Sequence, residues 1–196
     1  MKRLALTEEN EAKVAQEVIE LLDQGFVFVC PTDTVYGLVA DATNPKAVEK
    51  IFQMKGRASD KPISVFVADM VSAKKLARVN ARQEAYMENV WPGKFTVIVE
   101  SKHILSEGFE KDGKIGLRIP DSRFLGLLLR EYGKPLTGTS ANISGMPSCS
   151  ESQEVMKQFE NQALSPDALI DGGVLPISKE STVVDITGNA PKIVRA

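Results

Sequence analysis

The chain has 196 residues, of which 43% are hydrophobic and 26% charged, and its formal net charge is −2. This is the composition of an ordinary globular protein, long enough for one domain over residues 1–196. No stretch approaches the roughly 20 apolar residues of a membrane span. The N-terminus turns acidic after Leu6 and lacks the apolar region of a signal peptide. We therefore expect a soluble cytoplasmic protein without membrane partners.

Few side chains suited to metal or nucleophilic chemistry are present. Cys30 and Cys149 are the only cysteines, so the sequence has neither a disulfide framework nor zinc-site spacing. The single histidine, His103, excludes a multi-histidine metal site, and its surroundings predict a solvated loop residue. We expect no metal site made by the protein alone. The net charge of −2 argues against tight nonspecific binding of nucleic acid but allows a local basic groove.

Helical and strand patterns alternate through the first half of the chain. Thr7 is the predicted N-cap of the first helix and Gly25 its end, while Asn44-Pro45 opens a second helix that ends at Lys55. In chain order we expect a helix at 7–24, strands at 26–30 and 35–40, a helix at 45–55, a strand at 63–68, and helices at 69–78 and 81–90.

The second half continues the same mixture. Asp121 is the predicted cap of a helix that Gly133 ends, and Gly188-Asn189 is the predicted turn of a hairpin. In chain order we expect strands at 95–100 and 114–119, a helix at 121–132, a strand at 135–141, a helix at 151–160, and strands at 168–173, 181–186 and 192–195. Strands mixed with helices along the whole length favour one layered α/β domain.

Three cations gather in the segment KGRASDKP, residues 55–62 of an otherwise acidic chain. Lys55 ends a predicted helix and Arg57 follows it, and a basic side chain at a helix C-terminus is stabilised by about 0.3–1 kcal/mol. This explanation fits Lys61 poorly, because Lys61 lies beyond both the glycine and Asp60. The alternative is a clamp for a polyphosphate, held by charge-assisted contacts. Spacing alone does not decide between the two.

Two loops combine hydroxyl side chains with glycine. The segment GTSANISG (138–145) contains Ser140 and Asn142, and its glycines would let a ligand approach backbone N–H groups that form an anion-binding nest. The segment TDTVYG (32–37) contains Thr34, whose hydroxyl could bind a small polar ligand or hydrogen-bond its own turn. A ligand-free turn remains the alternative for both.

Arg118 and Arg195 lie in predicted strands. Arg118 has apolar neighbours in GLRIP, and Arg195 belongs to the last strand. Each must pair with an anion or face solvent, and each taken singly is better explained by solvent exposure.

Taken together, these segments resemble the YrdC/YciO family, the threonylcarbamoyl-adenylate synthases that begin threonylcarbamoyladenosine formation in tRNA. The resemblance is carried, in fixed order, by PTDTVYGL (31–38), KGRASDKPI (55–63), WPG (91–93), LRIP (117–120), PLTGTSANISGMPS (135–148) and ESTVVD (180–185). It implies a twisted, mixed parallel and antiparallel sheet flanked by helices, an α/β fold of the three-layer α+β type. Longer members add a second C-terminal domain, and the resemblance implies that this chain lacks it.

The resemblance also implies an activity. L-threonine, bicarbonate and ATP would give threonylcarbamoyl-AMP and pyrophosphate, with Mg²⁺ carried mainly by ATP, so the protein would be a nucleotidyltransferase. Further partners would be tRNA or double-stranded RNA and downstream threonylcarbamoyl-transfer proteins.

The family's functional residues carry over by motif, with Tyr36 as part of the wall. Lys55 and Arg57 would be catalytic. The threonine site would comprise Thr34, Phe66, Arg118, Ser140 and Ser181, and the nucleotide site would comprise Arg57, Lys61, Asn142, Ser150 and Arg195.

The sequence departs from the family pattern at several positions. Ala58 replaces the usual proline after KGR, and Phe66 stands where many members have a histidine that contacts threonine. These changes keep the nucleotide residues and alter the threonine side. They leave two alternatives: a YciO-type paralogue with another substrate, and an RNA-binding module with a basic concave face and no synthase activity.

Overall fold

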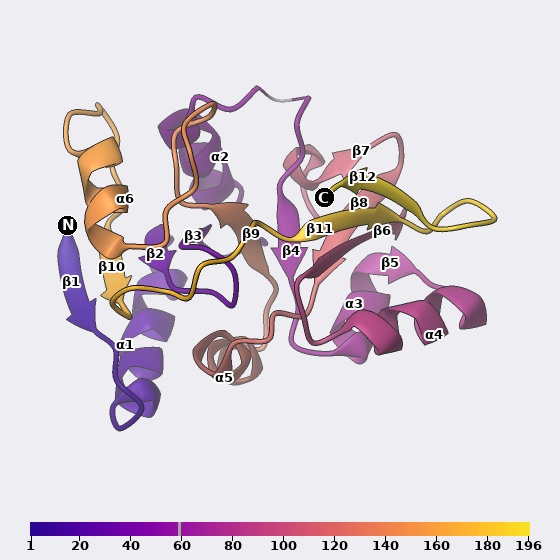
Figure 1. Cartoon of the computed structure of the whole chain (residues 1–196), viewed down its shortest axis with the longest axis horizontal. Helices are drawn as coiled ribbons and strands as arrows, with labels where there is room; N and C mark the ends of the chain where they lie inside the picture. Colours follow the sequence, from indigo (N-terminus) through magenta and orange to yellow (C-terminus); the bar gives the residue numbers. More distant parts are fainter. Residues whose placement is uncertain (59) are drawn as a thin grey trace.

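The computed structural model describes residues 1–58 and 60–196, so Ser59 of the segment KGRASDKP lies outside the described residues. A mixed sheet runs through the molecule (Figure 1). Its strands lie side by side in the order β1 (Lys2–Ala5), β10 (Ala168–Asp171), β2 (Phe28–Cys30), β3 (Gly37–Val39), β9 (Leu136–Ser140), β4 (Ser64–Phe66), β8 (Lys114–Arg118), β6 (Phe95–Ser101), β11 (Thr182–Asp185) and β12 (Lys192–Arg195).

Parallel and antiparallel pairings alternate irregularly across the sheet. The pairs β1–β10, β10–β2, β4–β8 and β6–β11 are parallel, whereas β2–β3, β3–β9, β9–β4, β8–β6 and β11–β12 are antiparallel. Two short strands, β5 (Ala77–Arg78) and β7 (Glu110–Lys111), add to β6 and β8. The prediction of a mixed sheet flanked by helices is confirmed.

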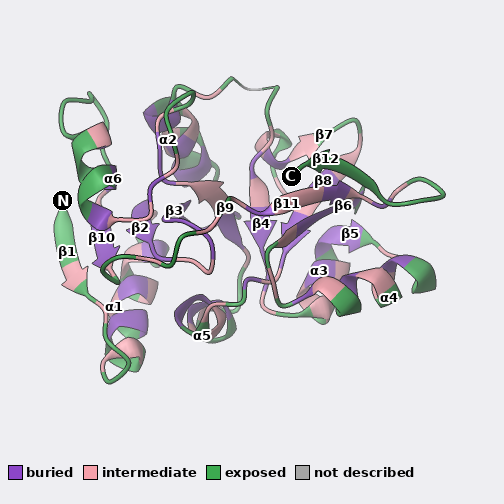
Figure 2. Ribbon diagram, in the orientation of Figure 1, coloured by how far each residue is buried: buried purple, intermediate pink, exposed green. Residues whose placement is uncertain are grey.

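Helices cover the sheet in two groups, each with its own core. α1 (Glu11–Asp23) and α5 (Arg123–Tyr132) pack against β2, β9 and β10 through one hydrophobic cluster. The other cluster joins the sheet to α2 (Pro45–Lys55), α3 (Met70–Leu76), α4 (Ala81–Val90) and α6 (Ser152–Phe159). The central strands are buried, while the outermost strands β1 and β12 are largely exposed (Figure 2).

The strands of one half of the sheet are two-faced because successive side chains point to opposite sides. On β8, Ile115 and Leu117 are buried in the core shared with α3 and α4, whereas Lys114, Gly116 and Arg118 line a cavity. β6 and β11 follow the same pattern, with core residues alternating with cavity residues. The cavity therefore occupies the face of the sheet opposite to α3 and α4.

Local signals place α2, whose last residue reaches this cavity. Asn44 is the N-cap, and its side-chain oxygen accepts hydrogen bonds from the N–H groups of Lys46 and Ala47. Gly56 ends the helix in the left-handed conformation, at φ 56°, where a residue without Cβ is favoured. The predicted helix 45–55 is confirmed, and Lys55 is its final residue.

Several other predictions need correction. α1 begins at Glu11 and not at residue 7, because Thr7 and Asn10 hydrogen-bond each other in a turn. α5 is capped by Ser122, whose hydroxyl accepts from the N–H of Leu125, and not by Asp121. The strand β1 was not predicted at all, since its charged sequence KRLA carries no strand pattern. It is fixed by parallel pairing with β10.

Other expectations are confirmed. β11 and β12 form the predicted hairpin, and Gly133 ends α5 at φ 72°. His103 is exposed, with its Nδ1 2.6 Å from a carboxylate oxygen of Glu110. No helix in the described part of the chain is long and apolar enough to cross a bilayer.

Candidate active site

A cavity of about 580 Å³ lies on the open face of the sheet. Residues from β3, β4, β6, β7, β8, β9, β11 and β12 line it, together with the end of α2 and the loops that follow α2 and β9. Nearly all the predicted site residues meet here: Thr34, Lys55, Arg57, Lys61, Phe66, Arg118, Ser140, Asn142, Ser181 and Arg195. Five of the six segments that carry the family resemblance therefore contribute to one site in space, and the sixth, WPG, touches it through the Gly93 carbonyl, which accepts from Arg118.

Two glycines keep the floor of the cavity open. A Cβ on Gly138 of β9 would lie 3.2 Å from the Phe66 ring, and a Cβ on Gly116 of β8 would lie 3.3 Å from the methyl group of Thr96. Both distances are tighter than ordinary van der Waals contact. The absence of side chains at these positions leaves the space over the strands available to a ligand.

Arg118 anchors one end of the cavity and is almost completely buried. Its Nη2 donates to a carboxylate oxygen of Asp33 at 2.7 Å, its Nε donates to the Gly93 carbonyl at 2.9 Å, and its Nη1 lies 3.4 Å from the Thr34 hydroxyl. The guanidinium also lies 5.8 Å from the centre of the Phe66 ring. Burial lowers the pKa of Arg118, and Asp33 opposes this shift. The arginine stays charged and fixed, facing a small polar space.

Ser181 and Arg195 form a second side of the site. The Ser181 and Thr96 hydroxyls are 2.9 Å apart, which ties β11 to β6. Arg195 of β12 donates to the Ser181 carbonyl at 2.9 Å and pairs with Glu180, whose carboxylate oxygen is 2.6 Å from Nη1. Arg195 therefore reaches the cavity from an otherwise exposed edge strand because Ser181 and Glu180 hold it there.

The segment after α2 supplies further cations. Arg57 donates from Nε to the Lys61 carbonyl at 2.8 Å and from Nη2 to the Pro62 carbonyl at 3.0 Å. Burial and the charge of Arg195 lower the pKa of Arg57, while Glu180 opposes them. Arg57 and Arg195, from distant parts of the chain, are thus close enough to repel each other electrostatically. An anion bound between them would reduce this repulsion.

Lys55 is placed differently from Arg57 and Lys61. Its side chain is buried, and its amino group donates to the carbonyl oxygens of Ser140 and Asn142 and to the Asn142 side-chain oxygen. Burial and the charge of Arg57 lower its pKa to about 7. Lys55 therefore lies in the wall of the cavity, bound to the loop that carries two other predicted site residues.

Two predicted residues, Ser150 of the nucleotide site and Tyr36 of the wall, lie outside the lining of the cavity. Ser150 is not among the residues that line the cavity, and its carbonyl accepts a hydrogen bond from the N–H of Leu175. Tyr36 is fully buried behind the cavity, where its hydroxyl donates to the Gly173 carbonyl at 2.7 Å and accepts from the N–H of Gly172. Tyr36 supports the 172–173 turn and does not line the site.

Other polar residues of the site were not predicted. Asp33 and Glu180 each pair with a site arginine, and Thr96 pairs with Ser181. Lys114 and Asp185 line the cavity and pair with each other at 2.9 Å. Asp33 and Glu180 lie inside the motifs PTDTVYGL and ESTVVD but outside the strands. Lys114 alternates with Arg118 along β8, so a search by strand face would have found Lys114.

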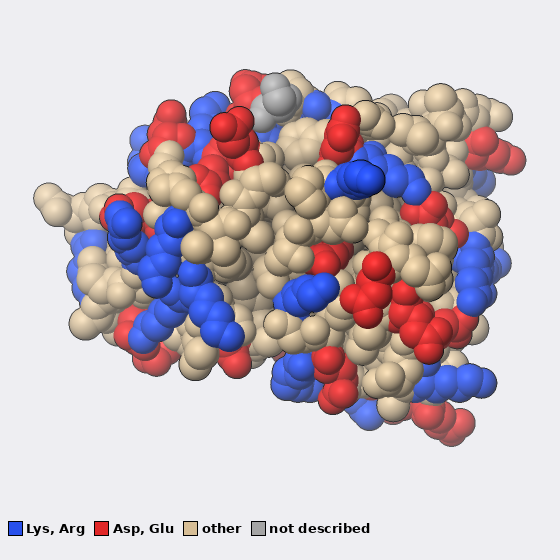
Figure 3. Space-filling model, turned by 180° about the vertical axis from the view of Figure 1, so that it is seen from behind, with Lys and Arg blue, Asp and Glu red and all other residues tan. Residues whose placement is uncertain are grey.

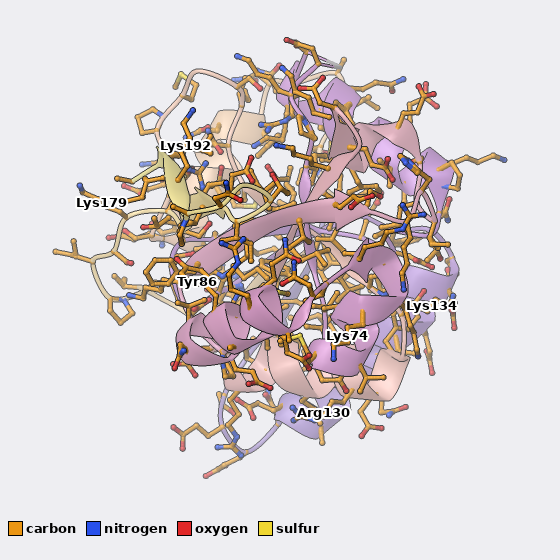
Figure 4. All side chains as sticks on the ribbon, turned by 90° about the vertical axis from the view of Figure 1, so that its right-hand side faces the viewer. Lys74, Tyr86, Arg130, Lys134, Lys179 and Lys192 are labelled. Carbon is orange, nitrogen blue, oxygen red and sulfur yellow. The ribbon has the colours of Figure 1, made fainter. Side chains whose placement is uncertain are left out.

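The cation cluster is a local feature of this cavity. On the face seen from behind, basic and acidic side chains are interspersed, with basic ones gathered toward the end that carries α3 and α4 (Figure 3). Lys179 and Lys192 project outward from the segment before β11 and from β12 (Figure 4).

Across residues 1–58 and 60–196, no three His, Cys, Asp or Glu side chains form a group that could hold a metal ion.

Comparison with known proteins finds relatives that match most of this chain. The threonylcarbamoyl-AMP synthase of Bacillus subtilis is 34% identical over 192 residues, which are 95% of this chain and 54% of that protein. The putative threonylcarbamoyl-AMP synthase of Methanocaldococcus jannaschii is 36% identical over 187 residues, which are 95% of this chain and 86% of the relative. The chain thus spans about half the length of the first relative and most of the second.

Solved structures share the fold. Sua5 of P. abyssi, solved in complex with L-threonine, has a TM-score of 0.88 and 29% identity, over 99% of this chain and 56% of that chain. YciO of E. coli has a TM-score of 0.87 at 24% identity, over 99% of this chain and 93% of that chain. The family model Sua5_yciO_yrdC, described as telomere recombination, matches residues 20–196. The chain belongs to the Sua5/YciO/YrdC family.

Proposed function

We propose that the protein is a threonylcarbamoyl-AMP synthase, which makes threonylcarbamoyl-AMP and pyrophosphate from L-threonine, bicarbonate and ATP. The observation that carries this proposal is that one cavity combines two chemically different regions. A fixed arginine among hydroxyl groups faces a group of cations supplied by the loop after α2 and by β12. The first end suits an amino acid, and the second suits a polyphosphate.

The amino acid would bind at the Arg118 end. The planar guanidinium, fixed by Asp33, would face the substrate carboxylate, since arginine and carboxylate match each other in geometry. The hydroxyl groups of Thr34, Ser140 and Ser181 line the same space and would hydrogen-bond the amino acid. Phe66 contributes an apolar surface there, which suits the methyl group of threonine.

The nucleotide would bind at the cation end. Arg57, Lys61 and Arg195 would contact the phosphates, and Asn142 would orient them from the loop after β9. Mg²⁺ prefers oxygen ligands and is commonly held by substrate phosphates with one or two carboxylates. Glu180, Asp112 and Asp185 are the carboxylates that line the cavity, and Glu180 is paired with Arg195.

The proposed chemistry needs no protein nucleophile. The threonine amine and bicarbonate first condense to N-carboxythreonine, forming one N–C bond and releasing water. A carbamate oxygen then attacks the α-phosphorus of ATP, one P–O bond forms, and the bond to pyrophosphate breaks. The protein must bring two anions together and stabilise the negative charge on the phosphates. Fixed cations on two sides of one cavity meet both needs. The names of the B. subtilis and M. jannaschii relatives support this activity.

The test is pyrophosphate release from ATP with Mg²⁺ and bicarbonate, in the presence and absence of L-threonine. We expect release that depends on both threonine and bicarbonate. Pyrophosphate release that depends on another amino acid would show that threonine is not the substrate, and it would favour a paralogue with a different substrate. Absence of release, with tight and salt-sensitive binding of double-stranded RNA by the same sample, would replace the synthase by an RNA-binding module.

A further inference from the structure

The amino group of Lys55 is fully occupied by the loop after β9. The side chain is 1% exposed, and Nζ lies 2.5 Å from the Ser140 carbonyl oxygen, 2.7 Å from the Asn142 carbonyl oxygen and 3.1 Å from the Asn142 Oδ1. In its protonated form this group is an ammonium, which has three N–H donors and no acceptor. Three protein oxygens therefore account for its entire capacity to donate.

The loop is also bound to the backbone of Lys55. The N–H of Ser144 donates to the Lys55 carbonyl at 2.8 Å. Within the loop, the Asn142 amide donates to the carbonyls of Ile143 and Met146 at 3.1 and 2.6 Å. Residues 140–146 are thus wrapped around the end of α2, with hydrogen bonds running in both directions.

Arg57 is bound in a different way, although it lies only two residues along the chain. Its donors go to the carbonyls of Lys61 and Pro62, within its own segment, and the side chain is only partly buried. For Lys55 to bind a phosphate directly, Nζ would have to leave at least one of its three oxygen partners. The Ser140 carbonyl also accepts from the N–H of Asn142 at 3.0 Å, but either oxygen of Asn142 would lose its Lys55 donor in a buried position, which is unfavourable.

We infer that Lys55 is a positioning residue, which fixes Ser140 and Asn142 for their substrates instead of binding the nucleotide itself. This role replaces the direct catalytic contact expected from the sequence. The identity of the substrates rests on the proposed function, whereas the fixing of the loop rests on the contacts alone.

Hydrogen exchange of the ligand-free protein tests the inference directly. Lys55→Met keeps the length of the side chain and removes its donors, so the backbone amides of residues 140–146 should exchange at least about tenfold faster than in the wild type. Lys46→Met, an exposed lysine of the same helix, is the matched control and should leave this loop unchanged. Unchanged exchange in folded Lys55→Met would overturn the inference. A lysine that contacted only the phosphate would not affect this loop in the ligand-free protein.

A double-mutant cycle tests how Lys55 affects the substrate. The dissociation constant of Mg-ATP is measured by calorimetry for Lys55→Met, Asn142→Ala and the double variant. If Lys55 acts through the loop, the double variant should bind within about twofold of the weaker single variant. If the two losses multiply, Lys55 has its own contact with the nucleotide and the inference is wrong.

Two controls keep these tests decisive. If Lys55→Met does not fold, Lys55→Gln replaces it, because the glutamine amide is polar and uncharged and keeps two donors. If the wild type lacks threonine-dependent pyrophosphate release, the proposed function fails, yet the exchange experiment still decides the role of Lys55.

Discussion

The arginines of the cavity differ in what balances their charge. Arg118 is paired with Asp33 and Arg195 with Glu180, whereas the hydrogen bonds of Arg57 go to backbone carbonyls. Arg57 also lies within reach of the charge of Arg195. Arg195 lowers the pKa of Arg118 as well, and Glu180 partly offsets the shift of Arg57, so repulsion is shared by all three arginines. Arg57 differs in that its hydrogen bonds go to backbone carbonyls and not to a carboxylate, and we therefore expect phosphate stabilisation to depend on it most.

Replacing Arg57 should separate activity from stability. We expect Arg57→Ala to lower turnover at least about 100-fold, because an arginine on a transferring phosphoryl group can contribute about 10³–10⁵. The free energy of unfolding should fall by only about 1 kcal/mol, since two hydrogen bonds within a partly exposed segment are lost. Turnover and urea denaturation are the measurements, with Arg130→Ala as a surface control. An unfolded Arg57→Ala variant would mean that the cation is structural.

Lys55 should give the protein a distinctive dependence on pH. Burial and Arg57 lower its pKa from 10.5 to about 7, so between these values the folded protein has released a proton that the unfolded chain retains. Stability from this group therefore rises with pH above 7 and is least below 7, where both states are protonated. The unfolding free energy of the wild type minus that of Lys55→Met should therefore become more positive as the pH rises above about 7, by up to about 1.4 kcal/mol per pH unit.

Urea denaturation of both proteins at several pH values from 6 to 9 measures this difference. Other titrating groups are common to the two proteins and cancel in the subtraction. A difference that does not change with pH would show that Lys55 keeps an ordinary pKa in the folded protein.

At the scale of elements, the β11–β12 hairpin carries Ser181 and Arg195 into the site and is held at its far end by α4. Arg82 of α4 donates to the carbonyls of Gly188 and Asn189 in the hairpin turn, and Gln83 donates to the Ile186 carbonyl at 3.1 Å. β12 itself is exposed along its whole length. The turn contacts therefore help to fix a strand that packing alone holds weakly.

Loosening the turn should weaken nucleotide binding from a distance. We expect Arg82→Ala to raise the KM for ATP a few-fold while changing kcat less, because Arg195 would be held less firmly in its binding position. Steady-state kinetics of this variant beside Arg130→Ala would measure the effect. Equal KM values for wild type and Arg82→Ala would mean that β6 and Ser181 suffice to place the hairpin.

Elements with a local signal were predictable, and those fixed by distant partners were not. Asn44-Pro45 and Gly56 define α2 within its own sequence, and the Gly188-Asn189 turn defines the hairpin. β1 has no such signal, because its place comes from pairing with β10, more than 160 residues away. The helix α1 starts later than predicted because Thr7 and Asn10 hydrogen-bond each other in a turn that precedes it.

At the scale of the whole molecule, strand order brings the site together. Residues from position 34 to position 195 meet because β9, β4, β8, β6 and β11 are neighbours in the sheet, in an order unlike their order in the chain. The motifs predicted which residue types belong to the site. The pairs Asp33–Arg118 and Thr96–Ser181 could not be predicted, because each depends on which strands lie side by side.

The same separation explains the change in the role of Lys55. The sequence placed three cations within seven residues and suggested one clamp. The structure turns Lys55 toward the loop after β9 and Arg57 toward its own segment, since Lys55 still belongs to the helix and Arg57 follows Gly56. The turn at Gly56 thus separates the buried Lys55 from Arg57 and Lys61, which face the cavity.

The most direct test of the central claim is the mass of the product formed from ATP, L-threonine and ¹³C-bicarbonate. A threonylcarbamoyl-AMP synthase must place one carbon from bicarbonate between the threonine nitrogen and the phosphate of AMP. We expect an adduct of threonine, one labelled carbonyl group and AMP, formed together with one equivalent of pyrophosphate. An adduct of threonine and AMP without the label, or hydrolysis of ATP with no adduct, would contradict the account.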